Sequence, residues 1–325
     1  MNKFFRIVFI LFLGILFALV GFYFWASSPN FRAEHYAKTY THTYPSKTNN
    51  DSIFSIITYN IGYLSGMTNN LAIEKPKSLF DNNLQTVLNA FKNINADIIA
   101  FQEIDFDSKR SFHVNQQNEI AKLGYNFIGQ TINWDKKYLP FPYFPISMHF
   151  GKTISGQSVL SKYKIVDQER FELERNSTNP FYYDAFYIDR LAQIVKIKIQ
   201  DQELILINVH LEAFHQETRI KQTKKIIEIY KRYRDDFPTI LLGDFNSDIH
   251  FENASIDLLL NLPKIGNAVF NKNKVLNTFD SEKPSERLDY IFFNTDFIKF
   301  IDGRVLTEFD QASDHLPLMM NFKFK

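Results

Sequence analysis

The sequence contains no cysteine. This absence excludes disulfide bonds, thiolate zinc sites, cysteine nucleophiles and lipid anchoring through a cysteine. Any bound metal must therefore be held by oxygen or imidazole ligands. The absence assigns the chain to no compartment, because proteins without disulfides occur on both sides of a membrane.

The chain also lacks an excess of either charge, since 37 basic and 36 acidic side chains leave a formal net charge of +1. This balance argues against a protein that coats nucleic acid through its overall charge, although a local basic groove is compatible with it. Glycine-rich phosphate loops of the GxGxxG and GxxxxGK types are missing as well. With 325 residues, 45% of them hydrophobic, the chain can build one large globular domain or two small ones.

One long hydrophobic run is present, at the N-terminus. Residues 7–25 carry no charge, and a helix of about 20 apolar residues spans the hydrocarbon layer of a membrane. Lys3 and Arg6 precede the run, so the positive-inside rule puts the N-terminus in the cytoplasm. We therefore predict one transmembrane helix within residues 1–27, with the rest of the chain outside the cytoplasm.

A cleaved signal peptide is the main alternative, because Ala26, Ser27 and Ser28 offer small residues near a cleavage point. Signal peptides usually have a shorter apolar region of about 7–15 residues, which favours an uncleaved anchor. Cleavage would make the protein secreted. Residues 28–50 are rich in Ser, Thr, Asn, Pro and Tyr without an apolar period, which predicts a linker before a domain at 51–325.

The domain repeats one layout, in which a short apolar run lies beside functional polar residues. Runs of this kind lie at 53–59, 97–101, 204–209, 239–242, 288–293 and 316–322. Their length and the Gly, Asn and Asp residues around them predict buried strands. Apolar residues recur at helical spacing in 79–94 and 220–233, between these runs. The alternation predicts an α/β domain with polar side chains gathered along one sheet edge.

Five of the polar residues form an oxygen-rich set: Asn60, Glu103, Asp244, Asn246 and Asp314. Carboxylate and amide oxygens suit Mg²⁺ or Mn²⁺ and suit zinc poorly. A hard cation neutralises charge on the oxygens of a phosphoester while water attacks the phosphorus. The set therefore favours a metal-dependent phosphoester hydrolase.

Two histidines, His210 and His315, follow the same layout and supply proton transfer near neutral pH. Each residue alone is weak evidence, because an Asp after a strand usually caps a turn and a lone His usually has a packing or surface role. The joint pattern of several polar strand ends in one chain favours a catalytic site.

The motifs also resemble those of a known family, the endonuclease/exonuclease/phosphatase superfamily, which includes DNase I-like nucleases, AP endonucleases, inositol polyphosphate 5-phosphatases and neutral sphingomyelinases. The matching segments are TYN (58–60), QE (102–103), NVHLEAF (208–214), GDFN (243–246), RLDYIF (287–292) and SDH (313–315). They occur in the family's order from about residue 52 to the C-terminus. The resemblance implies a catalytic domain with a four-layer α/β/β/α sandwich, in which two sheets pack face to face with helices outside.

The resemblance also implies roles for the metal side of the site. Glu103 would be the principal Mg²⁺ ligand, Asn60 would help to arrange metal and phosphate, and Asp314 would be a second metal ligand. His210 would contact the scissile phosphate or protonate the leaving oxygen. Arg190 resembles a phosphate-binding position of some members, but a surface arginine near a strand start is an equally good interpretation.

For the attacking water, the resemblance implies that Asp244 orients or deprotonates it. Asn246 would hold the phosphate. Asp289 corresponds to the acidic partner that fixes the orientation of the final histidine, His315. His315 would be the base or a phosphate contact. The choice between Asp244 and His315 as the general base stays open at this point.

The chain departs from the family pattern in residues 129–161, which carry many aromatic residues around three prolines. Proline disfavours regular structure, so we expect an aromatic loop across about 130–156. Its rings would either pack on the domain or form a lip over the active site that meets lipid or stacks on a base.

Two substrates fit these features. A membrane-held phosphodiesterase acting on a lipid headgroup accords with the predicted anchor, the neutral charge and the aromatic residues. A nuclease acting outside the cytoplasm fits the motifs equally well. A soluble inositol phosphatase is less favoured, because no dense basic cluster is evident. A third hypothesis is a membrane-tethered binding module of the same fold without catalysis; the intact set of polar residues argues against it.

Overall fold

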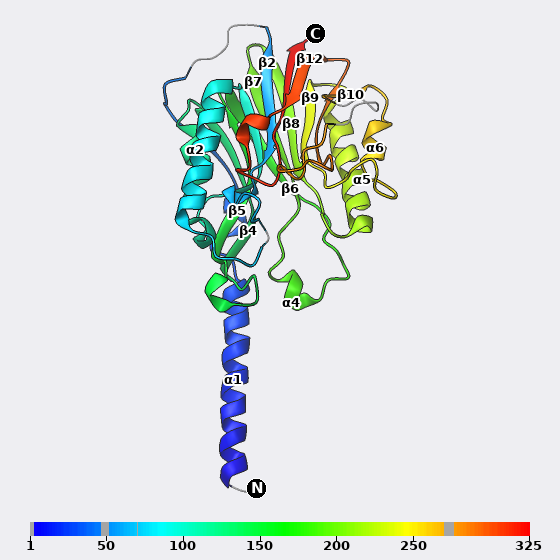
Figure 1. Cartoon of the computed structure of the whole chain (residues 1–325). Coiled ribbons are helices and arrows are strands. Elements are labelled where there is room, and N and C mark those ends of the chain that lie inside the picture. Colours follow the sequence, from blue (N-terminus) through cyan, green and yellow to red (C-terminus); the bar gives the residue numbers. More distant parts are fainter. Residues whose placement is uncertain (1–2, 47–51, 70, 270–275) are drawn as a thin grey trace.

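The computed structural model of this chain describes residues 3–46, 52–69, 71–269 and 276–325 (Figure 1). The helices in these residues are α1 (Lys3–Ser27), α2 (Lys77–Ile94), α3 (Gln116–Ala121), α4 (Phe181–Asp184), α5 (Gln216–Tyr233) and α6 (Asp257–Leu260). The strands are β1 (Ala37–Thr41), β2 (Phe54–Asn60), β3 (Ile98–Asp105), β4 (Phe127–Leu139), β5 (Gly151–Ser161), β6 (Lys164–Glu172), β7 (Leu191–Ile199), β8 (Gln202–His210), β9 (Thr239–Asp244), β10 (Ile265–Asn267), β11 (Asp289–Asn294), β12 (Ile298–Val305) and β13 (Leu318–Phe324).

The described strands form two mixed sheets. One has seven strands in the order β1-β4-β5-β3-β2-β13-β12, and the other has six in the order β10-β11-β9-β8-β7-β6. The central pair β2 and β3 is parallel, as is the central pair β8 and β9. The carboxyl ends of these four strands therefore lie at the same end of the sandwich.

Three hydrophobic cores lie between four layers. The first lies between the seven-stranded sheet and α2, and contains Tyr59 and Phe91. The second lies between the two sheets and contains Ile56 and Leu206. The third lies between the six-stranded sheet and α5, and contains Tyr230. With α2 on one outer face and α5 on the other (Figure 1), the predicted four-layer α/β/β/α sandwich is confirmed.

The sequences of the central strands are almost continuous apolar runs, because both faces of these strands are buried. In β8, Leu204 and Leu206 face the opposite sheet, while Ile205, Ile207 and Val209 face α5. Asn60, His210 and Asp244 are the last residues of such strands. This explains why the functional side chains follow the apolar runs.

The predicted linker at 28–50 differs from the structure, because part of it belongs to the sheet. β1 pairs with β4 in antiparallel register from Ala37 opposite Thr131 to Thr41 opposite Phe127. Upstream of β1, the backbone N–H groups of Asn30 and Phe31 donate hydrogen bonds to the Asp135 carboxylate. Residues 28–46 therefore run along the domain rather than away from it.

The expected aromatic loop at 130–156 is also wrong for most of its length. β4 and β5 are long antiparallel partners, and Trp134 lies within β4 opposite Ser155 of β5. Only residues 140–150 connect them as an irregular segment, and the three prolines of the stretch, Pro140, Pro142 and Pro145, all lie there. Proline therefore ends the regular structure where it occurs, and the strands continue on either side.

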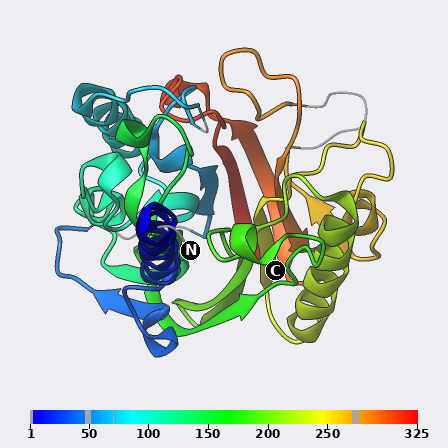
Figure 2. The same cartoon turned by 90° about the horizontal axis from the view of Figure 1, so that it is seen from below.

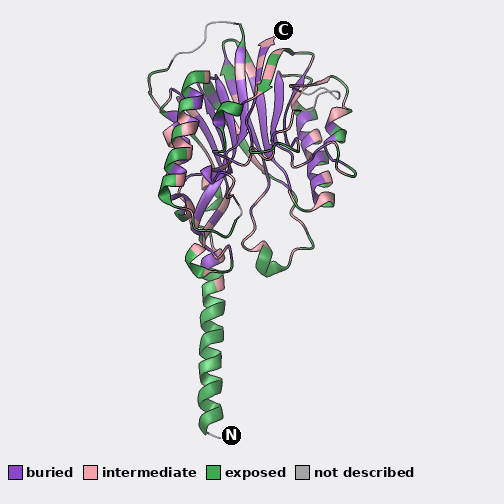
Figure 3. Ribbon diagram, in the orientation of Figure 1, coloured by how far each residue is buried: buried purple, intermediate pink, exposed green. Residues whose placement is uncertain are grey.

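α1 projects from the domain as a single helix, and it is the one helix of the described residues long and apolar enough to span a membrane. Apart from Ala26, its side chains are exposed or only partly covered (Figure 3). Seen from below, the helix lies within the outline of the domain (Figure 2). Such a helix is typical of a membrane anchor and also of a signal sequence.

Candidate active site

The end of the sandwich at which β2, β3, β8 and β9 finish collects polar side chains from both sheets. The strand register sets Asn60 of β2 beside Gln102 of β3, and His210 of β8 beside Asp244 of β9. Asp289, the first residue of β11, lies opposite Asp244 on its other side. Backbone pairing thus brings together residues from two strands in one sheet and from three strands in the other.

Glu103 lies at an irregularity in β3. The register between β3 and β5 shifts between Phe101 and Ile104, and Glu103 has a φ of 51°. A bulge of this kind redirects a side chain that regular pairing would hold on the sheet face. Here it brings Glu103 to the pocket together with Asp314.

Glu103 and Asp314 form the acidic corner of the site. The Asn69 amide donates to the Glu103 carboxylate at 3.0 Å and lies 3.4 Å from Asp314 Oδ2. Burial, and then the Asp314 charge, raise the pKa of Glu103 above its ordinary value. Two neighbouring, partly buried carboxylates that repel each other are stabilised by a hard cation, so this donor set fits Mg²⁺ or Mn²⁺.

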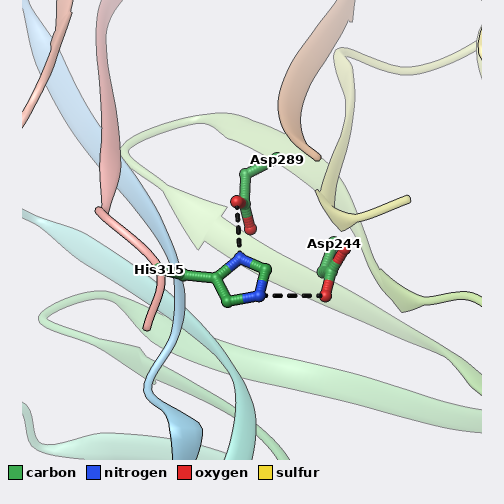
Figure 4. A group of neighbouring side chains, drawn as sticks. All are labelled: Asp244, Asp289 and His315. Atoms are coloured by element: carbon green, nitrogen blue, oxygen red, sulfur yellow. Dashed lines mark hydrogen bonds and ion pairs between the residues drawn. The ribbon is translucent and has the colours of Figure 1, made fainter. Parts of the chain in front are cut away.

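Asp289, His315 and Asp244 form a line of buried groups (Figure 4). His315 Nδ1 lies 2.9 Å from Asp289 Oδ2, and His315 Nε2 lies 3.8 Å from Asp244 Oδ2. Burial alone would lower the pKa of His315, but Asp289 and Asp244 outweigh it and hold this pKa well above the ordinary value. Burial also raises the pKa of Asp244 to about 7.

The same three residues could be considered as metal ligands, since one ligand atom from each lies within 4.8 Å of the others. However, the Nδ1 atom of His315 is already engaged by Asp289 in the geometry of a carboxylate–histidine pair. The acidic corner at Glu103 and Asp314 lacks such internal pairing. The acidic corner therefore offers the better donor set for a cation, and the line of groups is suited to proton transfer.

Two asparagines surround Asp244. Asn60 donates from its amide to Asp244 Oδ2 at 2.9 Å, and its Oδ1 accepts from the Gly62 backbone at 3.1 Å. The Asn246 backbone N–H donates to Asp244 Oδ1 at 2.9 Å, while its side-chain amide donates to the Leu211 carbonyl. Both oxygens of Asp244 are thus held in place on the floor of the pocket.

His210 and Arg190 form the basic side of the site. Arg190 Nη1 lies 2.5 Å from His210 Nε2, so the guanidinium donates and the imidazole accepts. Burial, then the charge of Arg190, hold the pKa of His210 well below its ordinary value. Arg190 is only 5% exposed, which rules out the interpretation as a surface arginine. It provides a buried positive charge facing the acidic corner.

Sequence reasoning missed three polar residues that support these groups. Glu212 lies 3.7 Å from Arg190 Nε and accepts a hydrogen bond from the Tyr187 hydroxyl at 2.9 Å. Asn69, described above, joins Glu103 to Asp314 from the loop after β2. Glu212 belongs to the NVHLEAF motif and could have been singled out there. Tyr187 and Asn69 lie in segments without any recognisable pattern.

A pocket of about 540 Å³ opens over these groups. Eight of the nine predicted residues line it, and the ninth, Asp289, contacts His315 from behind. Its walls are largely aromatic, with Tyr63, Trp134, Tyr183 and Phe214 among them. The pocket thus combines a charged floor with apolar walls.

Comparison with known proteins identifies the family and the fold of this chain. Residues 57–315 match the model of the endonuclease/exonuclease/phosphatase family. No curated protein matches this chain. Among solved structures, an endonuclease/exonuclease/phosphatase from Beutenbergia cavernae is similar with a TM-score of 0.62 at 16% identity, over 84% of this chain and 72% of that chain.

Two further structures have the same fold. The human Nocturnin catalytic domain, solved with a bound sulfate, has a TM-score of 0.59 at 16% identity, over 89% of this chain and 98% of that chain. A mannosyl-6-phosphatase from Bacteroides thetaiotaomicron has a TM-score of 0.57 at 17% identity, over 83% and 100% of the two chains. These likenesses confirm the DNase I-like fold. Together with the match over most of its length, they mean that this chain belongs to the endonuclease/exonuclease/phosphatase family.

Proposed function

We propose that this protein is a divalent-metal-dependent phosphodiesterase that acts outside the cytoplasm while α1 holds it in the membrane. The observation that carries the proposal is the convergence of all nine predicted residues, from distant segments, at the floor or behind the floor of one pocket. Membership of a family of phosphoester hydrolases supports it. A charged floor with a buried arginine suits a phosphate group, which accepts charge-assisted hydrogen bonds.

The acidic corner would hold the cation through the Glu103 and Asp314 carboxylates, with Asn60 beside it. When bound, Mg²⁺ or Mn²⁺ neutralises charge on the phosphate oxygens. On the opposite side, Arg190 and His210 approach the acidic corner, with His210 Nε2 3.7 Å from Glu103 Oε1. A phosphate bound in the pocket above these groups would be held from both sides.

Proton transfer falls to Asp244 and His315. His315, flanked by two buried carboxylates, is held as an imidazolium and can stabilise the negative charge that builds up on the phosphate. Asp244 is then the group free to take the proton of the attacking water, while Asn60 and Asn246 fix its orientation. Asp289 keeps the imidazole in place through Nδ1.

The retained anchor is supported by contacts between α1 and the folded domain. Ala26 is fully buried, and the Trp25 ring lies 6.2 Å from that of Tyr138. Cleavage near Ala26 would separate these partners. Lys3 and Arg6 before the apolar run favour an N-terminus in the cytoplasm and a catalytic domain outside it.

The test is hydrolysis of bis-p-nitrophenyl phosphate by the purified full-length chain. We expect turnover with Mg²⁺ or Mn²⁺, its loss on addition of EDTA and its return when the metal is restored. Glu103→Ala and His315→Ala should each reduce the rate by roughly 100-fold or more. Asp302→Ala, at an exposed position of β12, is the matched control and should keep the rate. Equal rates with EDTA, or in both active-site variants, would exclude the metal-hydrolase mechanism.

The non-catalytic binding module is the second candidate from the sequence. It predicts a folded protein without turnover on any phosphodiester. The mutually repelling carboxylates of Glu103 and Asp314 argue against it, because a chain released from catalysis has no reason to maintain them.

A further inference from the structure

The catalytic end of the sandwich is the end from which α1 leaves the domain. In Figure 1, α1 and α4 lie below the sheets, at the same end as the carboxyl ends of the central strands. A chain anchored through α1 therefore presents its active site toward its own membrane. The inference below rests on the proposed phosphodiesterase function and on the proposed anchor.

The contacts between α1 and the domain determine how close the neighbouring loops lie to the membrane. The apolar run 7–25 spans about 28 Å as a helix, close to the hydrocarbon thickness of about 30 Å. Its last turn contacts the domain, because Tyr23 lies 6.3 Å from the Phe181 ring of α4 and Phe22 lies 5.6 Å from the Tyr138 ring of β4. α4 and the end of β4 therefore lie at the level of the lipid headgroups.

No flexible segment separates the helix from the domain. The backbone N–H of Lys137 in β4 donates to the Ser28 carbonyl at 3.0 Å, and the Lys136 ammonium donates to the Ser27 carbonyl at 3.3 Å. The last residues of α1 are thus hydrogen-bonded to the strand that leads to the loop 140–150. The height of the active site above the membrane is fixed by these contacts.

Six large apolar or aromatic side chains are exposed around the mouth of the pocket, and we call them the apolar rim. They come from the loop 140–150, from α4 and from the segment after β8, and their exposed fractions are 63% for Tyr143, 82% for Phe144, 68% for Ile146, 77% for Phe181, 58% for Tyr182 and 83% for Phe214. Tyr143 and Phe214 also line the pocket. The rim is therefore continuous with the aromatic walls above the catalytic floor.

A bilayer fits this surface better than nucleic acid does. Exposed aromatic side chains at headgroup level gain free energy by insertion into the interface, whereas a polyanion needs several cations along its path. Among the described residues that line the pocket, Arg190 is the only lysine or arginine, and it is buried on the floor. One such charge matches a single phosphate rather than a strand of them.

We propose that the apolar rim inserts into the outer leaflet and that the substrate is a phosphodiester lipid drawn from the same bilayer. The lipid phosphate reaches the catalytic floor while the aromatic walls enclose the groups attached to it and the acyl chains stay near the rim. Water adds to phosphorus, one phosphorus–oxygen ester bond breaks, and the departing oxygen takes a proton. The products are a phosphomonoester and an alcohol.

Insertion is tested on the full chain in nanodiscs, using the absence of native cysteine. An environment-sensitive fluorophore is attached through Phe144→Cys or Tyr182→Cys, neither of which lines the pocket, and through Lys299→Cys as the control. Lys299 pairs with Lys323 near the C-terminal end of β13, at the end of the sandwich away from His315. We expect phosphatidylcholine carrying a quencher near the headgroup to quench the labels at 144 and 182 but not the label at 299. Equal, weak quenching at all three positions would overturn the proposed insertion.

The substrate is tested with a double variant of the rim, Phe144→Ser with Ile146→Ser. Hydrolysis of phosphatidylcholine or sphingomyelin in vesicles should fall about tenfold or more, in line with the loss of two inserted apolar side chains. Hydrolysis of soluble bis-p-nitrophenyl phosphate should be unchanged. Val166→Ser, which replaces an exposed apolar residue of β6 outside the rim, should preserve both activities.

The outcomes separate this inference from the proposed function. Equal losses on the vesicle and the soluble substrate would assign the rim a structural role and overturn the proposal. Cleavage of DNA or RNA without cleavage of any bilayer lipid by the unmodified chain would overturn the lipid substrate. If the unmodified chain hydrolysed no phosphodiester at all, the proposed function would fail, and the quenching result alone would still decide whether the rim meets the membrane.

Discussion

His315 lies between two buried carboxylates, and its contacts with the two differ. Asp289 holds Nδ1 at 2.9 Å, a hydrogen-bond distance, whereas Asp244 approaches Nε2 only to 3.8 Å. The first contact fixes the ring, and the second leaves Asp244 accessible from the pocket. This difference between the two contacts explains why Asp289 does not line the pocket and yet belongs to the site.

Asp289→Asn should lower the turnover number for bis-p-nitrophenyl phosphate by about 100-fold or more, with little change in KM. The amide keeps the shape but removes the charge that stabilises the His315 imidazolium. Steady-state kinetics on the purified variant provide the measurement, and Asp302→Asn serves as the exposed control. A variant with a raised KM and an unchanged turnover number would instead make Asp289 part of substrate binding.

The site residues could be predicted from the sequence because strand pairing brings the ends of apolar runs together. Asn60, His210 and Asp244 are such ends, and the family motifs add the remaining members. Asn69 could not be found in this way, since it follows a short turn and its contact with Glu103 depends on the path of a loop. Loop paths are determined by tertiary packing, which leaves no period in the sequence.

At the scale of elements, the pairing of β8 with β9 leaves no room for a side chain just before Asp244. A Cβ on Gly243 would lie 2.0 Å from the Val209 carbonyl oxygen, and the φ of Gly243 is 136°. Only glycine adopts this backbone conformation without strain. The glycine therefore positions the whole end of β9, including the GDFN residues that follow.

Gly243→Ala should destabilise the domain by about 3 kcal/mol, because the added methyl clashes with backbone and the φ becomes strained. Urea unfolding followed by tryptophan fluorescence measures the change. Gly14→Ala, where a Cβ would meet nothing within 4 Å, is the control and should unfold as the unmodified chain does. An unchanged midpoint for Gly243→Ala would show that the strand can relax around the methyl group.

β1 and β4 could not be predicted from the sequence, because neither strand has a regular apolar period. No residue of β1 is buried, so its place in the sheet depends on backbone pairing with β4 rather than on side-chain pattern. β4 carries buried Gln130, Asn133 and Asp135, which interrupt the alternation expected of a strand. The apolar strands β2, β8 and β9 carry a strong signal and were predicted correctly.

At the scale of the whole molecule, α1 belongs to none of the three hydrophobic cores. Its length and apolar composition are those of a helix that could span a membrane. We expect the mature protein to keep residues 1–28 and to stay with membranes after a high-salt wash. Intact mass after detergent extraction measures this. A mature N-terminus near Ser28 would instead identify a secreted protein.

Deletion of residues 1–28 is the control for this prediction. The truncated chain should fold, because both sheets and all three cores remain, and it should appear in the soluble fraction with unchanged circular dichroism in the β-sheet region. A truncated chain that fails to fold would mean that the contacts of Trp25 and Ala26 contribute to the stability of the domain.

The hydrogen bond between Lys137 and Ser28 has a kinetic consequence for an enzyme of this kind. With no slack between helix and domain, the lipids within reach of the proposed membrane-held enzyme are those that diffuse laterally past its active site within one leaflet. Its velocity then follows the mole fraction of substrate in that leaflet rather than the amount per volume of solution. Each enzyme would exhaust its own vesicle and leave the neighbouring vesicles untouched.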